Sequence, residues 1–359
     1  MGSCGKSLRE VMSTDISYRL VQAEDSPALS LLIGMSPSVG SIGFTYSYRA
    51  DVLEVNRALA TDLRGLVAMA DNQVVGMAFG DVLRVQLGGE VYPAVYISNL
   101  RVQANHRRKG VVRGMAEMLF RMAESELGSD YALYSAAPEG NISQRMAQRY
   151  GFELTHPIEG GVVPVRRSPP KEVPDLAVRQ ANPEELDAIA DGMNSFYREH
   201  NLWSPVTSAS LQKFLQVEVA GIQPNQLYVV ERQHRLVAGL SLSDQTQLVR
   251  MQITNLPAYA RWLGARLRIL SENGTLRALT VRQVWFLEGE LEAARYLWQS
   301  LRYTLRERGE SLGIAYDPRD RLRAVFQAPF WLPMFKASYS VRCKRPLEKD
   351  RATYCVAGP

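Results

Sequence analysis

The chain is poor in the residues that bind transition metals and form disulfides. Its 359 residues include only three cysteines and four histidines. Cys4, Cys343 and Cys355 are far apart and lack metal-ligand spacing, so we expect neither a metal site nor a disulfide framework. A reducing, cytoplasmic location is the simplest one for such a chain. No apolar run approaches the roughly 20 residues of a membrane span, so no membrane partner is expected.

A strong excess of one charge is also missing. Lysine and arginine number 42 against 37 aspartates and glutamates, which gives a net charge of +5. Because the arginines cluster in one loop and near the C-terminus, this excess does not imply nucleic-acid binding. A hydrophobic content of 46% with 22% charged residues is typical of a globular protein. The length favours two domains over one.

A basic glycine loop is the most informative segment, although it fits neither of two common phosphate motifs. Arg107-Arg108-Lys109-Gly110 lies between an apolar run, 95–102, and a helical pattern that begins near Val112. No Ser or Thr follows the lysine to hold magnesium, and Gly-x-Gly-x-x-Gly is absent. The order strand, loop, helix still predicts an anion site. The first turn of a helix leaves about four N–H groups unpaired, and adjacent cations strengthen the attraction to phosphate.

This segment resembles motif A of the GNAT superfamily of acyl-CoA-dependent N-acyltransferases. The motif is Arg/Gln-x-x-Gly-x-Gly/Ala after a strand that ends in Leu-x-Val. Here Leu100-Arg101-Val102 is followed by Arg107 to Val112, with Val112 where the family usually has Gly or Ala. The alternative is a solvated basic turn before a helix.

A second segment resembles the other half of the family's cofactor cleft. A short strand, 133–137, precedes Asn141, a helical run from Ser143, and Gly151-Phe152. The resemblance implies that the Asn141 amide bonds the pantetheine arm, whereas the alternative is that it only caps its helix. Gly151 fits the left-handed position that ends a helix.

The resemblance implies a fold and a co-substrate. We expect an α/β (α+β) fold with mixed, mostly antiparallel, splayed sheets flanked by helices. Acetyl-CoA, or another short acyl-CoA, would be the co-substrate, and no metal would take part. Backbone N–H groups of 108–112 and the Arg107 side chain would hold the pyrophosphate, and the strand edge would pair with the pantetheine amides. The residues expected to bind the cofactor are Leu100, Arg101, Val102, Arg107, Arg108, Lys109, Gly110, Val111, Val112, Arg113, Asn141 and Ser143.

The general acid and base are not marked in the sequence. The family's usual Glu position falls on Tyr96, and its usual Tyr position falls on Ala147. Tyr96 and Ser98 share a strand face and could hold a water that relays the amine proton. Tyr134 and Tyr150 are further catalytic candidates, and each of the four is as consistent with ordinary packing.

The two parts of the chain show the same order of predicted elements. Segments that begin at Ser17 and Leu176 each read as a strand followed by a capped helix, and a hairpin follows in both. We therefore expect two tandem GNAT-like domains. The expected divisions are a flexible leader at 1–15, an N-terminal domain at 16–157, a Pro-rich linker at 158–175 that is poor in hydrogen-bonded structure, a degenerate domain at 176–345, and a poorly ordered tail at 346–359.

The second copy is not expected to bind CoA. Its counterpart of the basic loop contains Glu288, Glu290 and Glu292 around one glycine. Carboxylates at a helix start satisfy the helix dipole and repel a pyrophosphate, by roughly 4 kcal/mol per charge pair at 4 Å and a dielectric of about 20. The copy would instead pack on the first, wall the acceptor cleft or form a homodimer.

Two functions fit these observations. One is an N-acetyltransferase that passes an acetyl group from acetyl-CoA to a primary amine by direct attack in a ternary complex. Its acceptor, a small-molecule or peptide amine, would lie near residues 35–56 and is not identified by the sequence. The other is a non-catalytic acyl-CoA-binding sensor or scaffold, which the missing Glu and Tyr favour.

Overall fold

One long mixed β-sheet runs through the whole molecule. The computed structural model describes residues 16–35, 43–139, 145, 149–255, 258–266, 274–309 and 311–355. The strands of this sheet follow the order β1-β3-β4-β5-β6-β16-β8-β15-β14-β11-β10-β9, and β7 pairs with β16 beside this path. Within it, β5 with β6 and β14 with β15 are parallel, and the other pairs are antiparallel. The predicted mixed, mostly antiparallel sheet with flanking helices is confirmed.

The N-terminal part of the chain forms the first half of the molecule. Its elements are β1 (Ser17–Leu20), η1 (Ala23–Asp25), α1 (Ser26–Gly34), β2 (Gly43–Tyr48), α2 (Val52–Leu59), β3 (Leu63–Ala70), β4 (Gln73–Leu87), β5 (Glu90–Val102), η2 (Ala104–His106), α3 (Val111–Leu127), β6 (Ala132–Pro138) and β7 (Glu153–Leu154).

The rest of the chain supplies the second half. Its elements are β8 (Ile158–Pro164), β9 (Leu176–Gln180), η3 (Pro183–Glu185), α5 (Leu186–Phe196), α6 (Ser208–Gln216), β10 (Asn225–Arg232), β11 (Arg235–Ser243), β12 (Val249–Asn255), α7 (Ala258–Arg266), β13 (Thr275–Leu276), β14 (Ala278–Phe286), α8 (Leu291–Thr304), η4 (Leu305–Glu307), β15 (Ser311–Tyr316), α9 (Leu322–Phe326) and β16 (Phe335–Arg342).

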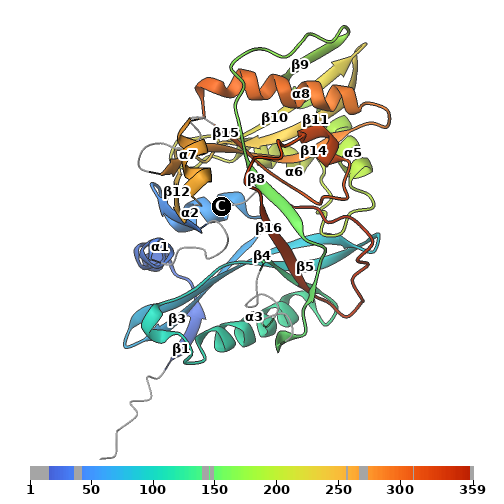
Figure 1. The fold of residues 1–359 in the computed structure, drawn as a ribbon. Coiled ribbons are helices and arrows are strands. Elements are labelled where there is room, and N and C mark those ends of the chain that lie inside the picture. Colours follow the sequence, from blue (N-terminus) through green and yellow to red (C-terminus); the bar gives the residue numbers. More distant parts are fainter. Residues whose placement is uncertain are drawn as a thin grey trace, which may run out of the picture.

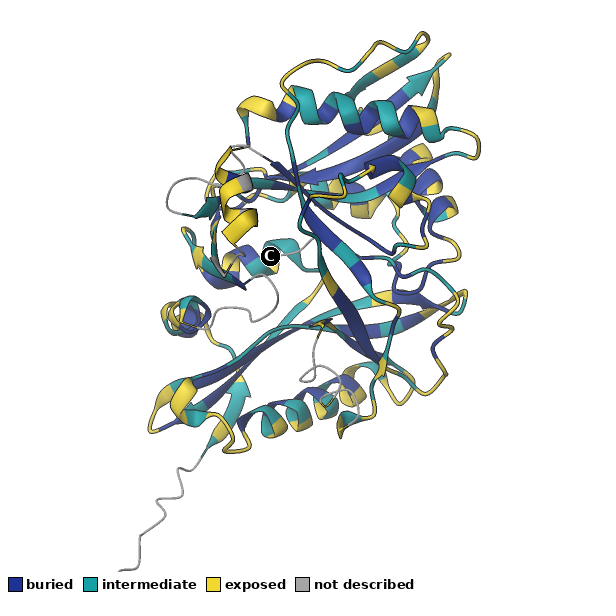
Figure 2. Cartoon of the chain, viewed as in Figure 1, coloured by how far each residue is buried: buried dark blue, intermediate teal, exposed yellow. Residues whose placement is uncertain are grey.

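The two long helices α3 and α8 cover opposite outer sides of the molecule, while α1, α2, α5 and α6 lie between them (Figure 1). In α3, Val111, Met115 and Leu119 are buried against β3 and β4 at helical spacing. The strands are largely buried, whereas the outward faces of the helices are exposed (Figure 2). Each half therefore has an outer face closed by one helix and an inner face turned towards the other half. No helix among the described residues is long and apolar enough to cross a membrane.

The expected linker is wrong for residues 158–164, which form strand β8. This strand pairs with β15 from Glu159 to Pro164, and residues 158–160 also pair with β16. Pro164 and two glycines suggest an irregular segment. In the structure Pro164 ends the strand, and the glycines leave room for the Phe335 and Met334 side chains. The C-terminal strand β16 lies between β6 and β8, so it joins the two halves into one sheet.

The expected disordered tail is also wrong over residues 346–355. Leu347, Thr353 and Cys355 are 8%, 2% and 8% exposed, and Leu347 and Cys355 join the cluster of apolar side chains between the halves. The Thr353 N–H donates to the Asp317 carboxylate over 3.0 Å. Positions 356–359, like the leader 1–15, lie outside the described residues.

Both halves repeat one strand irregularity. Opposite β4, the register of β5 skips one residue between Ser98 and Arg101, and Asn99 has a φ of 50°. Opposite β11, the register of β14 skips one residue between Arg282 and Trp285. The residue that corresponds to Asn99, Gln283, has a φ of 49°. These matching bulges support the predicted tandem relation and align the two halves residue by residue.

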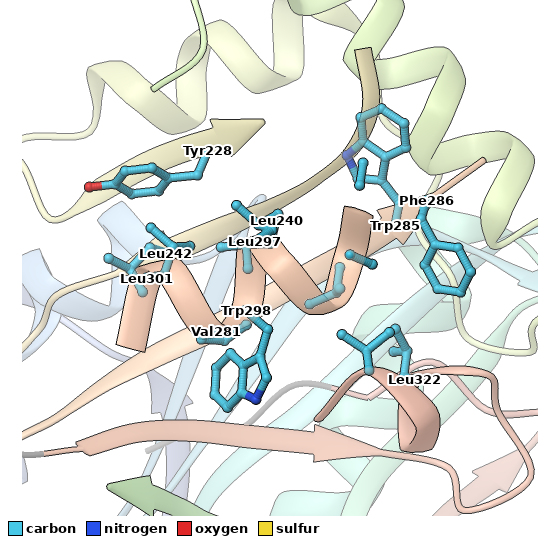
Figure 3. Close-up of a cluster of buried hydrophobic side chains, with 14 of the residues drawn as sticks. Tyr228, Leu240, Leu242, Val281, Trp285, Phe286, Leu297, Trp298, Leu301 and Leu322 are labelled. Carbon is cyan, nitrogen blue, oxygen red and sulfur yellow. The ribbon is translucent and has the colours of Figure 1, made fainter. Parts of the chain in front are cut away.

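A large aromatic core stabilises the second half. Figure 3 shows Trp285 and Trp298 in a cluster of buried side chains to which β10, β11, β14 and α8 contribute. Both indoles are essentially inaccessible, at 1% and 0% exposure. Trp285 is seated on α5, where a Cβ added at Gly192 would lie 2.4 Å from its ring. A small second sheet, β13-β12-β2, joins the halves on another side.

Replacement of Trp285 by alanine is expected to lower the free energy of unfolding by about 3–5 kcal/mol, since it removes a fully buried indole and leaves a cavity. Trp262→Ala is the matched control. That indole is 69% exposed, so its loss should change stability by no more than about 0.5 kcal/mol. Urea unfolding followed by circular dichroism would measure both, and equal effects of the two substitutions would contradict the seating of Trp285.

Candidate functional site

Strands β5 and β6 pair over a short stretch and then diverge. Their parallel pairing covers only Ala94↔Ala132, Val95↔Leu133 and Tyr96↔Tyr134. Beyond this point β5 stays with β4 as far as Val102, and β6 stays with β16 as far as Pro138. Two strands that were neighbours thus follow different partners, and the side of β5 that faced β6 is left without a strand.

The bulge at Asn99 sets the direction in which the free edge points. Gln103 N–H donates to the Val75 carbonyl on β4 over 2.9 Å. Since strand groups alternate with a period of two, the backbone groups of Leu100 and Val102 point away from β4, towards the space that β6 has left. Their side chains pack in the α3-side core. A ligand with amide groups could add to this edge as a strand does.

The basic loop lies at the end of the same free edge. Arg108 and Gly110 have φ values of 65° and 85°, and Gly110 occupies the N-cap of α3. The first helical hydrogen bond runs from Gly114 N–H to Gly110 C=O, over 3.0 Å. The N–H groups of Val111, Val112 and Arg113 therefore precede the helical ladder and are available to an anion.

The cationic side chains of the loop differ in their contacts. Arg108 and Lys109 are exposed. Arg107 is also exposed, but its Nε donates to the Val102 carbonyl over 3.3 Å instead of reaching towards the helix. Arg113 forms an exposed ion pair with Glu117 at 2.9 Å. Asn141 and Ser143, the other residues expected to bind the cofactor, lie outside the described residues.

A row of polar side chains crosses the inner face of the first half where the strands part. Asp81 on β4 pairs in register with Tyr96 on β5, which pairs with Tyr134 on β6. The rings of Tyr96 and Tyr134 are 5.0 Å apart, and Tyr134 meets Tyr339 of β16 at 6.0 Å. Ser98 follows Tyr96 on the same face, as predicted. The structure thus groups three of the four catalytic candidates.

Tyr150 is not part of this group. Its ring contacts Phe120 of α3 at 6.5 Å, on the outer side of the sheet. The structure therefore does not bring Tyr150 together with Tyr96 and Ser98, because the segment that carries it packs against α3.

Asp81, the one carboxylate of this row, was not among the residues predicted for the site. Burial raises the pKa of Asp81 above its ordinary 3.8, although hydrogen bonds from the Asp62 and Thr61 N–H groups oppose the rise. The Asp62 carboxylate adds to the rise and Lys213 reduces it. Burial also raises the pKa values of Tyr96 and Tyr134, so both phenols stay protonated near neutral pH. An acidic residue inside a long strand was the available signal, since such positions are rarely charged.

Arg101 lies on the same inner face, beyond the bulge. Its Nη1 donates to the Leu100 carbonyl over 3.2 Å, while its buried Nε has no partner among the described residues. Burial lowers the pKa of Arg101, and the Tyr46 and Tyr48 phenols oppose this effect. Burial in turn raises the pKa of Tyr46 to about 12. These tyrosines belong to β2, within the region predicted to contact the acceptor.

In the second half the two parallel strands diverge in the same way, but different side chains occupy the corresponding positions. Its parallel pairing ends at Thr280↔Gly313, three residues before Gln283, just as the first ends at Tyr96, three before Asn99. Trp285 occupies the position that corresponds to Arg101. At the start of α8, Glu290 pairs with Arg232 at 3.2 Å. The described residues contain no group of three or more His, Cys, Asp or Glu side chains that could hold a metal ion.

Comparisons with known proteins agree with this geometry. Residues 41–155 match the model of an acetyltransferase (GNAT) domain. No curated protein sequence matches the chain.

Solved structures share the fold over nearly the whole chain. Saccharomyces cerevisiae N-myristoyltransferase with bound myristoyl-CoA is 10% identical, with a TM-score of 0.64 over 95% of this chain and 85% of that one. A GCN5-related N-acetyltransferase from Kribbella flavida is 12% identical, with a TM-score of 0.55 over 92% of this chain and 71% of that one. A probable N-acyltransferase from Enterococcus faecalis is 14% identical, with a TM-score of 0.52 over 92% and 72%.

Gly110→Asp is expected to weaken CoA binding by at least about 100-fold. The new carboxylate would satisfy the helix N–H groups itself and repel a pyrophosphate placed there. Gly128→Asp is the matched control, because Gly128 caps the other end of α3 with a φ of 77° and, like Gly110, has no atom within 4 Å of an added Cβ. Isothermal titration with CoA would compare them, and equal affinities of both variants would contradict an anion site at Gly110.

Proposed function

We propose that this protein transfers an acyl group from acyl-CoA to an amine, because residues 41–155 match the model of a GNAT acetyltransferase domain and the chain shares the fold of N-acyltransferases. The observation that carries the proposal is the separation of β5 from β6, with the backbone N–H groups that precede the α3 hydrogen-bond ladder at its end. A thioester with a long amide-containing arm and a pyrophosphate matches both features at once. Acyl-CoA has that composition.

Acetyl-CoA is the donor that we propose first, because the matched domain belongs to an acetyltransferase family. The yeast N-myristoyltransferase, which shares the fold, has myristoyl-CoA bound. Donors of increasing chain length would therefore be compared directly.

The proposed reaction is a direct transfer in a ternary complex. The amine nitrogen attacks the thioester carbonyl carbon, a C–N bond forms, the C–S bond breaks, and CoA leaves as a thiolate. A free backbone N–H of Leu100 or Val102 would stabilise the oxyanion, and alignment of the two reactants alone can contribute about 7–11 kcal/mol. The amine proton passes to a base, and the thiolate takes a proton before CoA departs.

We propose Asp81 as that base, with Tyr96 and a water completing the relay. Asp81 lies directly beside Tyr96 across the β4–β5 ladder, and burial makes its carboxylate a better proton acceptor than an exposed aspartate. Tyr134, next to Tyr96, is placed to donate a proton to the leaving thiolate. Asp81 would thus supply the carboxylate that is missing at the position of Tyr96.

A non-catalytic acyl-CoA-binding sensor is the second candidate, because the usual Glu and Tyr are replaced. The two are separated by incubation with acetyl-CoA and longer acyl-CoA donors, together with a panel of amines, while the released thiol is measured. Thiol release that depends on an amine supports the transferase. Tight CoA binding without release on any amine would support the sensor.

Asp81→Asn is expected to lower kcat by about 100- to 1,000-fold without changing CoA affinity, since it removes the proton acceptor alone. In the parent protein kcat should fall as pH decreases through the pKa of Asp81, which lies above 3.8, and the variant should lose this acidic limb. Asp71→Asn, at an exposed carboxylate in the turn between β3 and β4, is the control. A pH–rate profile of Asp81→Asn with an unchanged acidic limb would contradict the assignment.

Stability gives an independent readout for the same variant. The folded-state pKa of Asp81 lies above its ordinary value, so its ionisation lowers the free energy of unfolding as pH rises through that window. Asp81→Asn should therefore be no less stable than the parent at neutral pH. A large loss of stability would show that the side chain is structural.

A further inference from the structure

In the interior between the two halves, Arg282 is a cation for which the described residues supply no hydrogen-bond or ion-pair partner. It lies on β14, and its side chain is only partly exposed. Its Nε is buried without a hydrogen bond, and within the described part of the chain its guanidinium forms neither a hydrogen bond nor an ion pair. A buried charge that lacks a counterion is costly in free energy, so a buried arginine is normally paired with a carboxylate.

Other arginines of the second half show how this chain usually treats the same group. Arg319 binds the Asp317 carboxylate through two nitrogens and also donates to backbone carbonyls. Arg302 donates to the Pro164 carbonyl, and Arg308 pairs with Asp244. Arg179 bonds both oxygens of Glu185. Arg282 departs from this pattern although it is less exposed to solvent than a surface arginine.

The groups that surround Arg282 cannot neutralise it. Burial lowers its pKa, and the titratable groups that act on its charge are the phenols of Tyr354, Tyr96 and Tyr339. Burial raises the pKa values of Tyr354 and Tyr96, so these phenols are neutral at physiological pH. Tyr96 belongs to the polar row of the first half, Tyr339 to β16 and Tyr354 to the C-terminal segment. The cation therefore faces the place where acyl transfer is proposed.

The alignment of the two halves explains where Arg282 lies. Arg282 corresponds to Ser98, on the inner face directly before the bulge, whereas Trp285 fills the neighbouring slot of the second half. Trp285 thus fills the inner face of the second half, while Arg282 on the same face presents a positive charge towards the splay of the first. A ligand held between the halves would meet the acyl-transfer row on one side and Arg282 on the other.

We propose that Arg282 binds the carboxylate of the acceptor, so that the acceptor is an amine that also carries a carboxylate, as a free amino acid does. This inference rests on the proposed acyl transfer. A guanidinium matches a carboxylate with two parallel hydrogen bonds, and the neighbouring phenols can donate further ones. The second half then determines acceptor specificity, although it does not hold the donor.

The kinetic test compares Arg282→Met with the parent, using acetyl-CoA and a panel of free amino acids alongside their carboxamides. The parent should prefer the amino acids. In the variant, KM for the amino acids should rise about 10- to 100-fold, while KM for acetyl-CoA and the rates with carboxamides stay unchanged. Arg282→Lys should recover part of the preference. Arg235→Met, at an exposed arginine of the same half, is the matched control and should behave as the parent.

Several results would overturn the inference. One is a parent enzyme that uses carboxamides as well as amino acids. Another is an Arg282→Met variant that keeps the full preference for amino acids. A preference for O-phosphoethanolamine that Arg282→Met abolishes would assign the site to phosphate instead of carboxylate.

A binding test separates this inference from the proposed reaction. Millimolar amino acid should raise the melting temperature of the parent and of Arg235→Met but not that of Arg282→Met. Without ligand, Arg282→Met should melt at or above the parent temperature, because it removes an uncompensated cation. If the ligand shift occurs but no amine is acylated, the transferase proposal fails and the carboxylate site stands. If the shift is absent, or persists in Arg282→Met, the carboxylate site fails whether or not acylation occurs.

Discussion

The rest of the structure depends on a shortage of backbone partners where β5 and β6 separate. Buried N–H and C=O groups must be paired, so a strand edge inside a sheet is left open only where something else can occupy it. The bulge at Asn99 creates this edge, and the N-terminus of α3 adds unpaired N–H groups at its end. One extended ligand with amides and an anionic group would satisfy both. The inner-face row of Asp81, Tyr96 and Tyr134 then lies where the strands part, at the reactive end of such a ligand.

The two halves use one architecture for different purposes. In the second half, Trp285 occupies the slot beside the bulge, and Glu290 with Arg232 occupies the helix start. That half lacks the basic loop of the first half, yet it is not a separate appendage. Strands β8 and β16 lie in the middle of the common sheet, and Leu347 and Cys355 are packed between the halves. Because the halves share a core, Arg282 can be held in a fixed position relative to Tyr96, as a specificity residue must be.

The sequence predicted what depends on neighbours along the chain. The strand–loop–helix around Gly110 and the repetition of the two halves are patterns of this kind, and the structure shows both of them. The pairing of β8 with β16 joins residues about 180 positions apart, as in Ile158 with Ala337, and no sequence periodicity predicts such a pairing. Asp81 became a candidate only through its register with Tyr96, and Arg282 only through the absence of a partner. Contacts of this kind follow from tertiary structure and cannot be counted along a sequence.

The most direct test of the account is a crystal structure of the protein with bound CoA. The account predicts the pyrophosphate at the N–H groups of Val111 to Arg113, the pantetheine along Leu100 and Val102, and the sulfur beside Tyr96 and Tyr134. A nucleotide bound at the start of α8, or a pantetheine arm that avoids the free edge of β5, would contradict it.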